Sequence, residues 1–254
     1  MTRLIYTDQL AEDSLGHIED FGITSEKSDK LQQLETDLSN AGILSELDRL
    51  WVFKNNNIVA SLVDLANGNY CRPQPGISYN QLTGFIGDGS KAYIDTQYNP
   101  AEDWNKYFIT GASFGVYIPN EVTNPTTTTI LGARTGATTD EDQVIMSYTG
   151  SGYIIARLNN DEFASFSTSS LQGFYLVNRD GSSVIIEENG TQVGSATLSD
   201  TGSRPSNNIT LFALNEDSGQ SSFQDLNIGL FYIGNKLNAT ARQNFNDAVQ
   251  KYFT

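Results

Sequence analysis

The sequence predicts a mainly β protein, an antiparallel β-sandwich that follows a short helical part and ends in a C-terminal helix. The main evidence is a dense series of short segments rich in Val, Ile, Tyr, Phe and Thr between about residues 84 and 234, separated by Gly, Asn, Asp and Ser. Their spacing of roughly 8–12 residues is typical of sandwiches and barrels. With 254 residues, the chain is long enough to build such a core without a disulfide or a structural metal.

A helical part precedes the strand-rich region. Apolar residues recur there at three- and four-residue steps, as in an amphipathic helix. We expect helices at about residues 25–40 and 43–51, separated by Asn40-Ala41-Gly42. Residues 1–66 would then be an N-terminal arm with anchoring or oligomerising helices, and residues 67–254 the sandwich. The apolar residues of this pattern are Leu31, Leu34, Leu38, Leu44, Leu47, Leu50 and Trp51.

Turn and cap residues predict how the second half of the chain is connected. Asn189-Gly190 lies between two strand-like segments, and Asn-Gly is the strongest short signal for a two-residue hairpin. Asp180-Gly181 and residues 149–152 predict two more hairpins. Successive hairpins indicate antiparallel sheets rather than parallel βαβ units. Asn238 is the expected cap of the last helix, residues 238–253, which has one apolar face.

The composition limits the partners. A formal net charge of −15 repels nucleic acid phosphates and anionic lipid headgroups, so we expect no nucleic-acid partner. No stretch approaches the roughly 20 apolar residues of a membrane span, so we expect no membrane insertion. The N-terminus lacks the apolar core of a signal peptide, which predicts synthesis in a cytoplasm. Cys71 is the only cysteine, so no intrachain disulfide can form.

No set of residues predicts catalysis or cofactor binding. His17 is the only histidine and lies in a weakly patterned segment, which argues against a Ser–His–Asp or Cys–His arrangement. Glu187 and Glu188 are adjacent, so on a strand they would point to opposite faces. The run Asp140-Glu141-Asp142 is consecutive and loop-like. Neither group makes the carboxylate pair of a glycosidase. We expect a protein that is not an enzyme, with a polysaccharide-degrading glycosidase or lyase on the same fold as the alternative.

Acidic loops make calcium the one metal ion that this sequence could bind. Calcium takes oxygen ligands from carboxylates and backbone carbonyls. Asp140 and Asp142 are the candidate ligands in this sequence, and carboxylates that simply face solvent are the alternative. We expect no required cofactor, with calcium as the ion that these loops would bind.

Three aromatic residues are candidates for carbohydrate contact. Sugar rings pack their C–H faces on exposed aromatic rings. Trp104 is the best candidate because it lies in a polar loop, and Tyr107 and Tyr98 are nearby. A packing role for Trp104 remains the alternative.

Three stretches together resemble a family of tailed-bacteriophage virion proteins with a concanavalin A-like, laminin-G-like jelly roll. The resemblance covers most of residues 23–254 and implies a jelly-roll sandwich with a structural role in a virion, without catalytic residues to carry over. The stretches are ITSEKSDKLQQL (23–34) with AGILSELDRLW (41–51), GFIGDGSKAYIDTQYNP (84–100) and GLFYIGNKLNATARQNF (229–245).

This resemblance implies a location and partners. We expect a virion protein assembled in the host cytoplasm, displayed on a tail, fibre, baseplate or capsid surface. Its partners would be other virion proteins, further copies of itself, with a trimer as the first expectation, and a host-surface glycan. Host adhesion and particle decoration both stay open. A free sugar-binding lectin is a further alternative, although the N-terminus argues against a secretory route.

Overall fold

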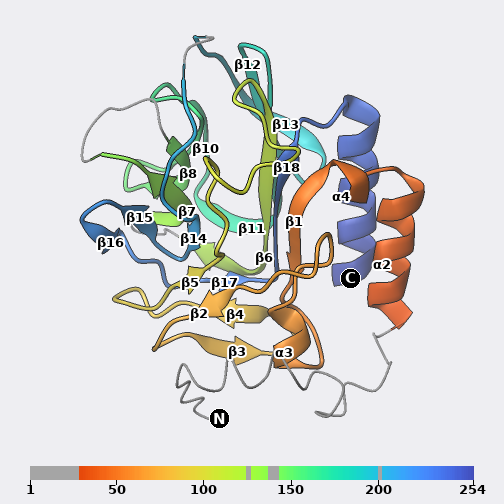
Figure 1. Ribbon diagram of the computed structural model, residues 1–254. Helices are drawn as coiled ribbons and strands as arrows, with labels where there is room; N and C mark the ends of the chain where they lie inside the picture. The colour runs from red at the N-terminus through yellow and green to blue at the C-terminus, as the bar shows by residue number, and fades with distance from the viewer. Residues whose placement is uncertain (1–28, 124–126, 137–142, 200–201) are drawn as a thin grey trace.

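Two facing sheets form the body of the protein (Figure 1). The computed structural model describes residues 29–123, 127–136, 143–199 and 202–254. The first sheet has six strands, and the pairing of β1 with β18 brings distant parts of the chain side by side. The predicted antiparallel, mainly β sandwich is therefore confirmed. In sheet order, the strands are β1 (Leu47–Val52), β18 (Leu230–Asn235), β6 (Gly111–Thr123), β11 (Ser170–Asp180), β12 (Ser183–Glu188) and β13 (Thr191–Thr197).

The second sheet is built around β8, which pairs with β9 on one side and β7 on the other. β15 also joins β7, in the only parallel pairing among the described strands. A small third sheet of β17 (Asn227–Ile228), β4 (Gly84–Ile86) and β3 (Ser78–Asn80) lies at one end of the sandwich (Figure 1). The second sheet contains β10 (Ala164–Ser167), β9 (Tyr153–Leu158), β8 (Gln143–Thr149), β7 (Thr128–Arg134), β14 (Thr210–Leu211), β5 (Ile94–Asp95) and β2 (Arg72–Pro73), with β15 (Leu214–Glu216) and β16 (Gly219–Ser221) beside β7.

Apolar side chains fill the space between the two large sheets. Phe114, Val116 and Ile118 alternate along β6 and are all fully buried in this core. This is the two-residue period of a strand with one face on a core. Trp51 of β1 stacks on Phe231 of β18, with ring centroids 5.8 Å apart. The core thus gives the loops at the sandwich ends a rigid base.

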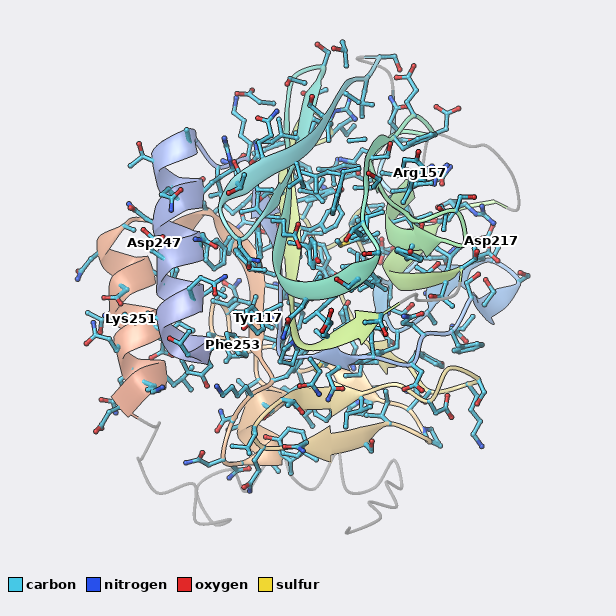
Figure 2. The ribbon with its side chains drawn as sticks, turned by 180° about the vertical axis from the view of Figure 1, so that it is seen from behind. Tyr117, Arg157, Asp217, Asp247, Lys251 and Phe253 are labelled. Atoms are coloured by element: carbon cyan, nitrogen blue, oxygen red, sulfur yellow. The ribbon has the colours of Figure 1, made fainter. Side chains whose placement is uncertain are left out.

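Two helices cover the outer face of the six-stranded sheet. Helices α2 (Asp29–Asn40) and α4 (Ala239–Phe253) run side by side next to β1 and β18 (Figures 1 and 2). Phe245 of α4 packs against Phe174 and Tyr232 at centroid distances of 5.3 and 4.6 Å. Lys251 of α4 donates a hydrogen bond of 2.8 Å to Asp37 of α2. The helices therefore bury their apolar faces in a second apolar cluster, on the opposite side of this sheet from the main core.

The predicted helix at residues 43–51 is wrong. The chain forms a short 3-10 turn, η1 (Leu44–Glu46), followed by strand β1. Leu50 faces the helices and Trp51 faces the main core, so β1 is buried on both faces. Because both faces of β1 are buried, its apolar residues do not alternate strictly with polar ones, and they can fall on helical steps by chance. Pairing with β18 decided the outcome.

The strand at residues 47–52 also changes the expected boundary between the helical part and the sandwich. Because β1 pairs within the six-stranded sheet, the sandwich includes residues before 67. Helix α3 (Ile58–Ser61) and the turn after it connect β1 to β2. The anchoring role expected for residues 1–66 stays a prediction, and residues 1–28 lie outside the described part of the chain.

The local turn and cap predictions are confirmed. Asn189 and Gly190 have φ of 50° and 78° between β12 and β13, as the turn of a two-residue hairpin requires. The side chain of Asn238 accepts a hydrogen bond of 2.9 Å from the N–H of Ala241 and caps α4. The helix predicted at about residues 25–40 is present as α2 over Asp29–Asn40.

Candidate functional site

An exposed pair of aromatic rings lies in the loop between β5 and β6. Trp104 is 40% exposed and Phe108 is 47% exposed, and their rings meet edge to face with centroids 5.6 Å apart. The guanidinium carbon of Arg204, from a loop that is distant in sequence, lies 4.0 Å from the centre of the indole. We call Trp104, Phe108 and Arg204 the aromatic platform. It combines apolar ring surface with a cationic hydrogen-bond donor.

Asp48 of β1 holds this loop in place. Its carboxylate accepts hydrogen bonds from the N–H groups of Asn105, Lys106 and Tyr107 at 3.2, 2.8 and 3.0 Å. It also accepts the hydroxyl of Tyr98 at 2.8 Å. Asp48 is buried, so its charge depends on these four donors for stabilisation. A residue in the first strand of the sandwich therefore sets the backbone of the loop that presents the platform.

The sequence prediction that Tyr98 and Tyr107 contact carbohydrate is wrong, because both side chains are fully buried. The Tyr107 hydroxyl donates to Oδ1 of Asn159 at 2.5 Å, and Nδ2 of Asn159 donates to the carbonyls of Phe108 and Ile109. Burial raises the pKa of both phenols well above the usual value, so both stay neutral donors. Their role is to position the loop from below.

One face of the Trp104 indole is covered by another side chain, and the rest of the platform is exposed. Arg204 covers one face of the Trp104 indole and donates a hydrogen bond of 3.4 Å to the carbonyl of Tyr107. A cation over an aromatic face is attracted by the ring quadrupole, which fixes the indole orientation. The remaining exposed surface of Trp104 and the ring of Phe108 can pack against the C–H face of a sugar.

The paired glutamates do not form a catalytic site. Glu187 of β12 binds Nε of Arg242 on helix α4 at 2.8 Å. Glu188 accepts the hydroxyl of Tyr175, whose ring lies in the main core, at 2.9 Å. The two carboxylates thus lie on opposite faces of the sheet, as their adjacent positions predict. They do not share a cleft, which a glycosidase would require.

The candidate calcium ligands Asp140 and Asp142 lie outside the described residues, so calcium binding stays a prediction. In the part of the chain that the structure describes, no three His, Cys, Asp or Glu residues gather in a group able to hold a metal ion. Cys71 is a buried free thiol whose pKa is raised well above the usual value by burial. None of the described helices has the length and apolar character that crossing a membrane requires.

The comparison with solved structures supports the fold. The structure is similar to the binding domain of botulinum neurotoxin serotype C1, with a TM-score of 0.60 and 15% identity, over 81% of this chain and 52% of that chain. The binding domain of botulinum neurotoxin DC in complex with rat synaptotagmin II gives a TM-score of 0.59 at 15% identity, over 81% and 52% of the two chains. Neither a protein-family model nor a curated protein sequence matches this chain.

A third similar structure concerns botulinum neurotoxin type C, whose cell entry depends upon interaction with two ganglioside molecules. Its TM-score is 0.58 at 16% identity, over 82% of this chain and 53% of that chain. This chain therefore spans about half the length of these structures. At such identities the likeness establishes the β fold and carries no functional residue across.

Sequence reasoning found one member of the platform and missed two. Trp104 is on the exposed surface, as expected. Phe108, four residues later in the same loop, carried a weak signal, since an aromatic in a polar segment is a candidate contact. Arg204 carried none, because it reaches the platform from a loop about 100 residues away. The anchoring role of Asp48 was equally invisible, since it depends on pairing across the fold.

Proposed function

We propose that this protein is a non-enzymatic glycan-binding module that uses the aromatic platform. The observation that carries the proposal is the exposed Trp104, held by Arg204 and by a loop that a buried carboxylate fixes. A preorganised ring loses little conformational entropy on binding, so its contact energy is retained as affinity. The β fold is shared with receptor-binding toxin domains, one of which was determined with SialylT.

The test is a glycan array probed with the full chain and with Trp104→Ala. Leu82→Ala is the matched control, because Leu82 is 73% exposed and lies away from the platform, in the turn between β3 and β4. We expect Trp104→Ala to weaken glycan binding about tenfold or more, as for an aromatic at the centre of a contact, and Leu82→Ala to leave it unchanged. Equal binding by all three proteins would remove the platform from the proposal.

We further propose that this module is displayed on a tailed-bacteriophage virion. The support is the resemblance of residues 23–34 with 41–51, 84–100 and 229–245 to virion proteins. The similar solved structures are toxin domains, so they add nothing to this part of the proposal. On a virion, the helical part before β1 would face other virion proteins or further copies of the chain, with a trimer as the first expectation.

Immunogold labelling of intact particles, with antibody against residues 84–254, tests the location. Label at the tail tip or fibres would support host adhesion, and label over the head would support capsid decoration. Particles that carry no label would contradict the virion proposal, while the glycan-binding proposal would stand on its own array result. Light scattering of the purified chain would check the expected trimer.

A further inference from the structure

A second surface of the protein contains two arginines, although the chain as a whole is strongly acidic. The outer face of β7, β8 and β9 contains a depression of about 340 Å³. Arg134 of β7 and Arg157 of β9 both line it, although the formal net charge of the chain is −15. Figure 2 shows Arg157 on the side of the sandwich away from α2 and α4. We call this depression the arginine groove.

Arg157 has donors that no other described residue uses. Its Nε donates to the carbonyl of Asp161 at 3.0 Å, and its guanidinium carbon lies 5.2 Å from the ring centre of Phe163. The described residues supply no ion pair to Arg157 and no hydrogen bond to its two terminal nitrogens. Arg134, in contrast, pairs with Glu216. The Phe163 ring and the Asp161 carbonyl orient a guanidinium whose outer edge remains available.

Two arginines and one aspartate, Asp161, line the groove, so its lining carries a net positive charge. Burial lowers the pKa of Arg157, and the nearby Arg134 lowers it further, whereas Asp161 opposes the shift. Arginine stays protonated in proteins, so this unfavourable charge is not relieved by loss of a proton. A bound anion would compensate it directly.

The rest of the lining suits a sugar. Hydroxyl groups and the amide of Gln143 make up most of its polar side chains, and they can donate to and accept from sugar hydroxyls. Ile145 and Leu214 supply apolar surface beneath them. The planar fork of a guanidinium matches a carboxylate in a bidentate geometry. The polar lining residues besides the arginines include Thr127, Thr129, Gln143, Ser147, Thr149 and Ser222.

We propose that the arginine groove binds the carboxylate of an acidic sugar unit, a uronic or sialic acid, with Arg157 as its anchor. This inference rests on the proposed glycan-binding function and adds the class of glycan. It also makes the groove a second subsite, separate from the aromatic platform in the loop before β6.

Calorimetric titration of the full chain tests the inference with two matched pairs of probes. One pair is tetragalacturonate and its fully methyl-esterified form, and the other is 3′-sialyllactose and lactose. The variant is Arg157→Gln. The control is Arg72→Gln, which removes the same charge from an exposed residue at the opposite edge of the same sheet. Melting curves of both variants verify that they fold.

We expect at least one acidic probe to bind more tightly than its neutral counterpart. Arg157→Gln should weaken that binding about 10- to 100-fold, the range for a charged hydrogen-bonded contact, and Arg72→Gln less than twofold. The inference is overturned if neither acidic probe is preferred, or if the two variants lose affinity equally.

Titration of Trp104→Ala with the same probes separates this inference from the proposed function. Neutral binding that needs Trp104, without any preference for acid, would leave the platform standing and end the groove inference. Acid binding that needs Arg157 but not Trp104 would support the groove as a subsite of its own, and the glycan array would then decide on the platform by itself.

Discussion

Asp48 accepts the hydroxyl hydrogen bond of Tyr98 at 2.8 Å, and this pair joins the first strand of the sandwich to the loop of the aromatic platform. The two residues are 50 positions apart in the sequence. Because the same carboxylate also accepts three loop N–H groups, one buried side chain determines both loop geometry and local stability. The exposed residues that would meet a ligand depend on a residue that would never touch it.

The first prediction concerns Asp48→Ala. The substitution leaves three backbone N–H groups and one phenol without their acceptor, so we expect the free energy of unfolding to fall by about 3 kcal/mol. Urea denaturation measures this change. Glu102→Ala is the control, because Glu102 is an exposed acid in the same loop. A loss no larger than that of the control would show that Asp48 does not hold the loop.

The second prediction concerns the turn at Asp88. Partial burial raises the pKa of Asp88, but hydrogen bonds from the N–H groups of Lys91, Ala92 and Ser90 outweigh it and lower the pKa to about 2. The unfolded value is about 3.9, so the stabilisation is complete above about pH 5 and disappears as the pH falls from about 4 through 2.

Denaturation of Asp88→Ala at several pH values tests whether this stabilisation is lost as the pH falls. We expect the variant to be less stable than the original chain by about 1 kcal/mol near pH 6, as for the loss of a capping side chain. The difference should shrink below about pH 4. The exposed Asp225 supplies the control Asp225→Ala, for which we expect little change at either pH. A constant difference from pH 3 to pH 6 would contradict the assignment.

The third prediction concerns the helices on the outer face. Phe245→Ala removes the ring that fills the space between Phe174 and Tyr232, and should lower the free energy of unfolding by about 3–5 kcal/mol. Phe163→Ala, at a ring that is about half exposed, should cost less than about 1 kcal/mol. Thermal melting of the two variants distinguishes a helix that is part of the core from one that lies loosely on the sheet.

The fourth prediction concerns calcium. If Asp140 and Asp142 bind the ion, calcium will raise the melting temperature, because a ligand that binds only the folded state stabilises it. A chelator should then lower the melting temperature, and the double variant Asp140→Asn, Asp142→Asn should not respond. Magnesium serves as the control ion. A melting temperature that changes with neither calcium nor chelator would contradict calcium binding.

Sequence patterns located most of the strands and one platform residue. A strand with one buried face has apolar residues at alternate positions, and β6 shows this pattern at Phe114, Val116 and Ile118. The burial of Tyr98 and Tyr107 was harder to predict, since the same loop segment contains exposed Trp104 and buried Tyr107 three residues apart. No local pattern separates them, because burial there depends on contact with Asp48 and Asn159.

The sequence by itself determined the features that depend on neighbouring residues. The Asn189-Gly190 turn, the Asn238 cap and the antiparallel hairpins follow from backbone preferences of a few consecutive residues. Only the tertiary structure decided that residues 47–52 form a strand, and that Arg134 and Arg157 line one groove. These outcomes depend on pairing between segments far apart in the chain, whose burial and hydrogen bonds outweigh local preference.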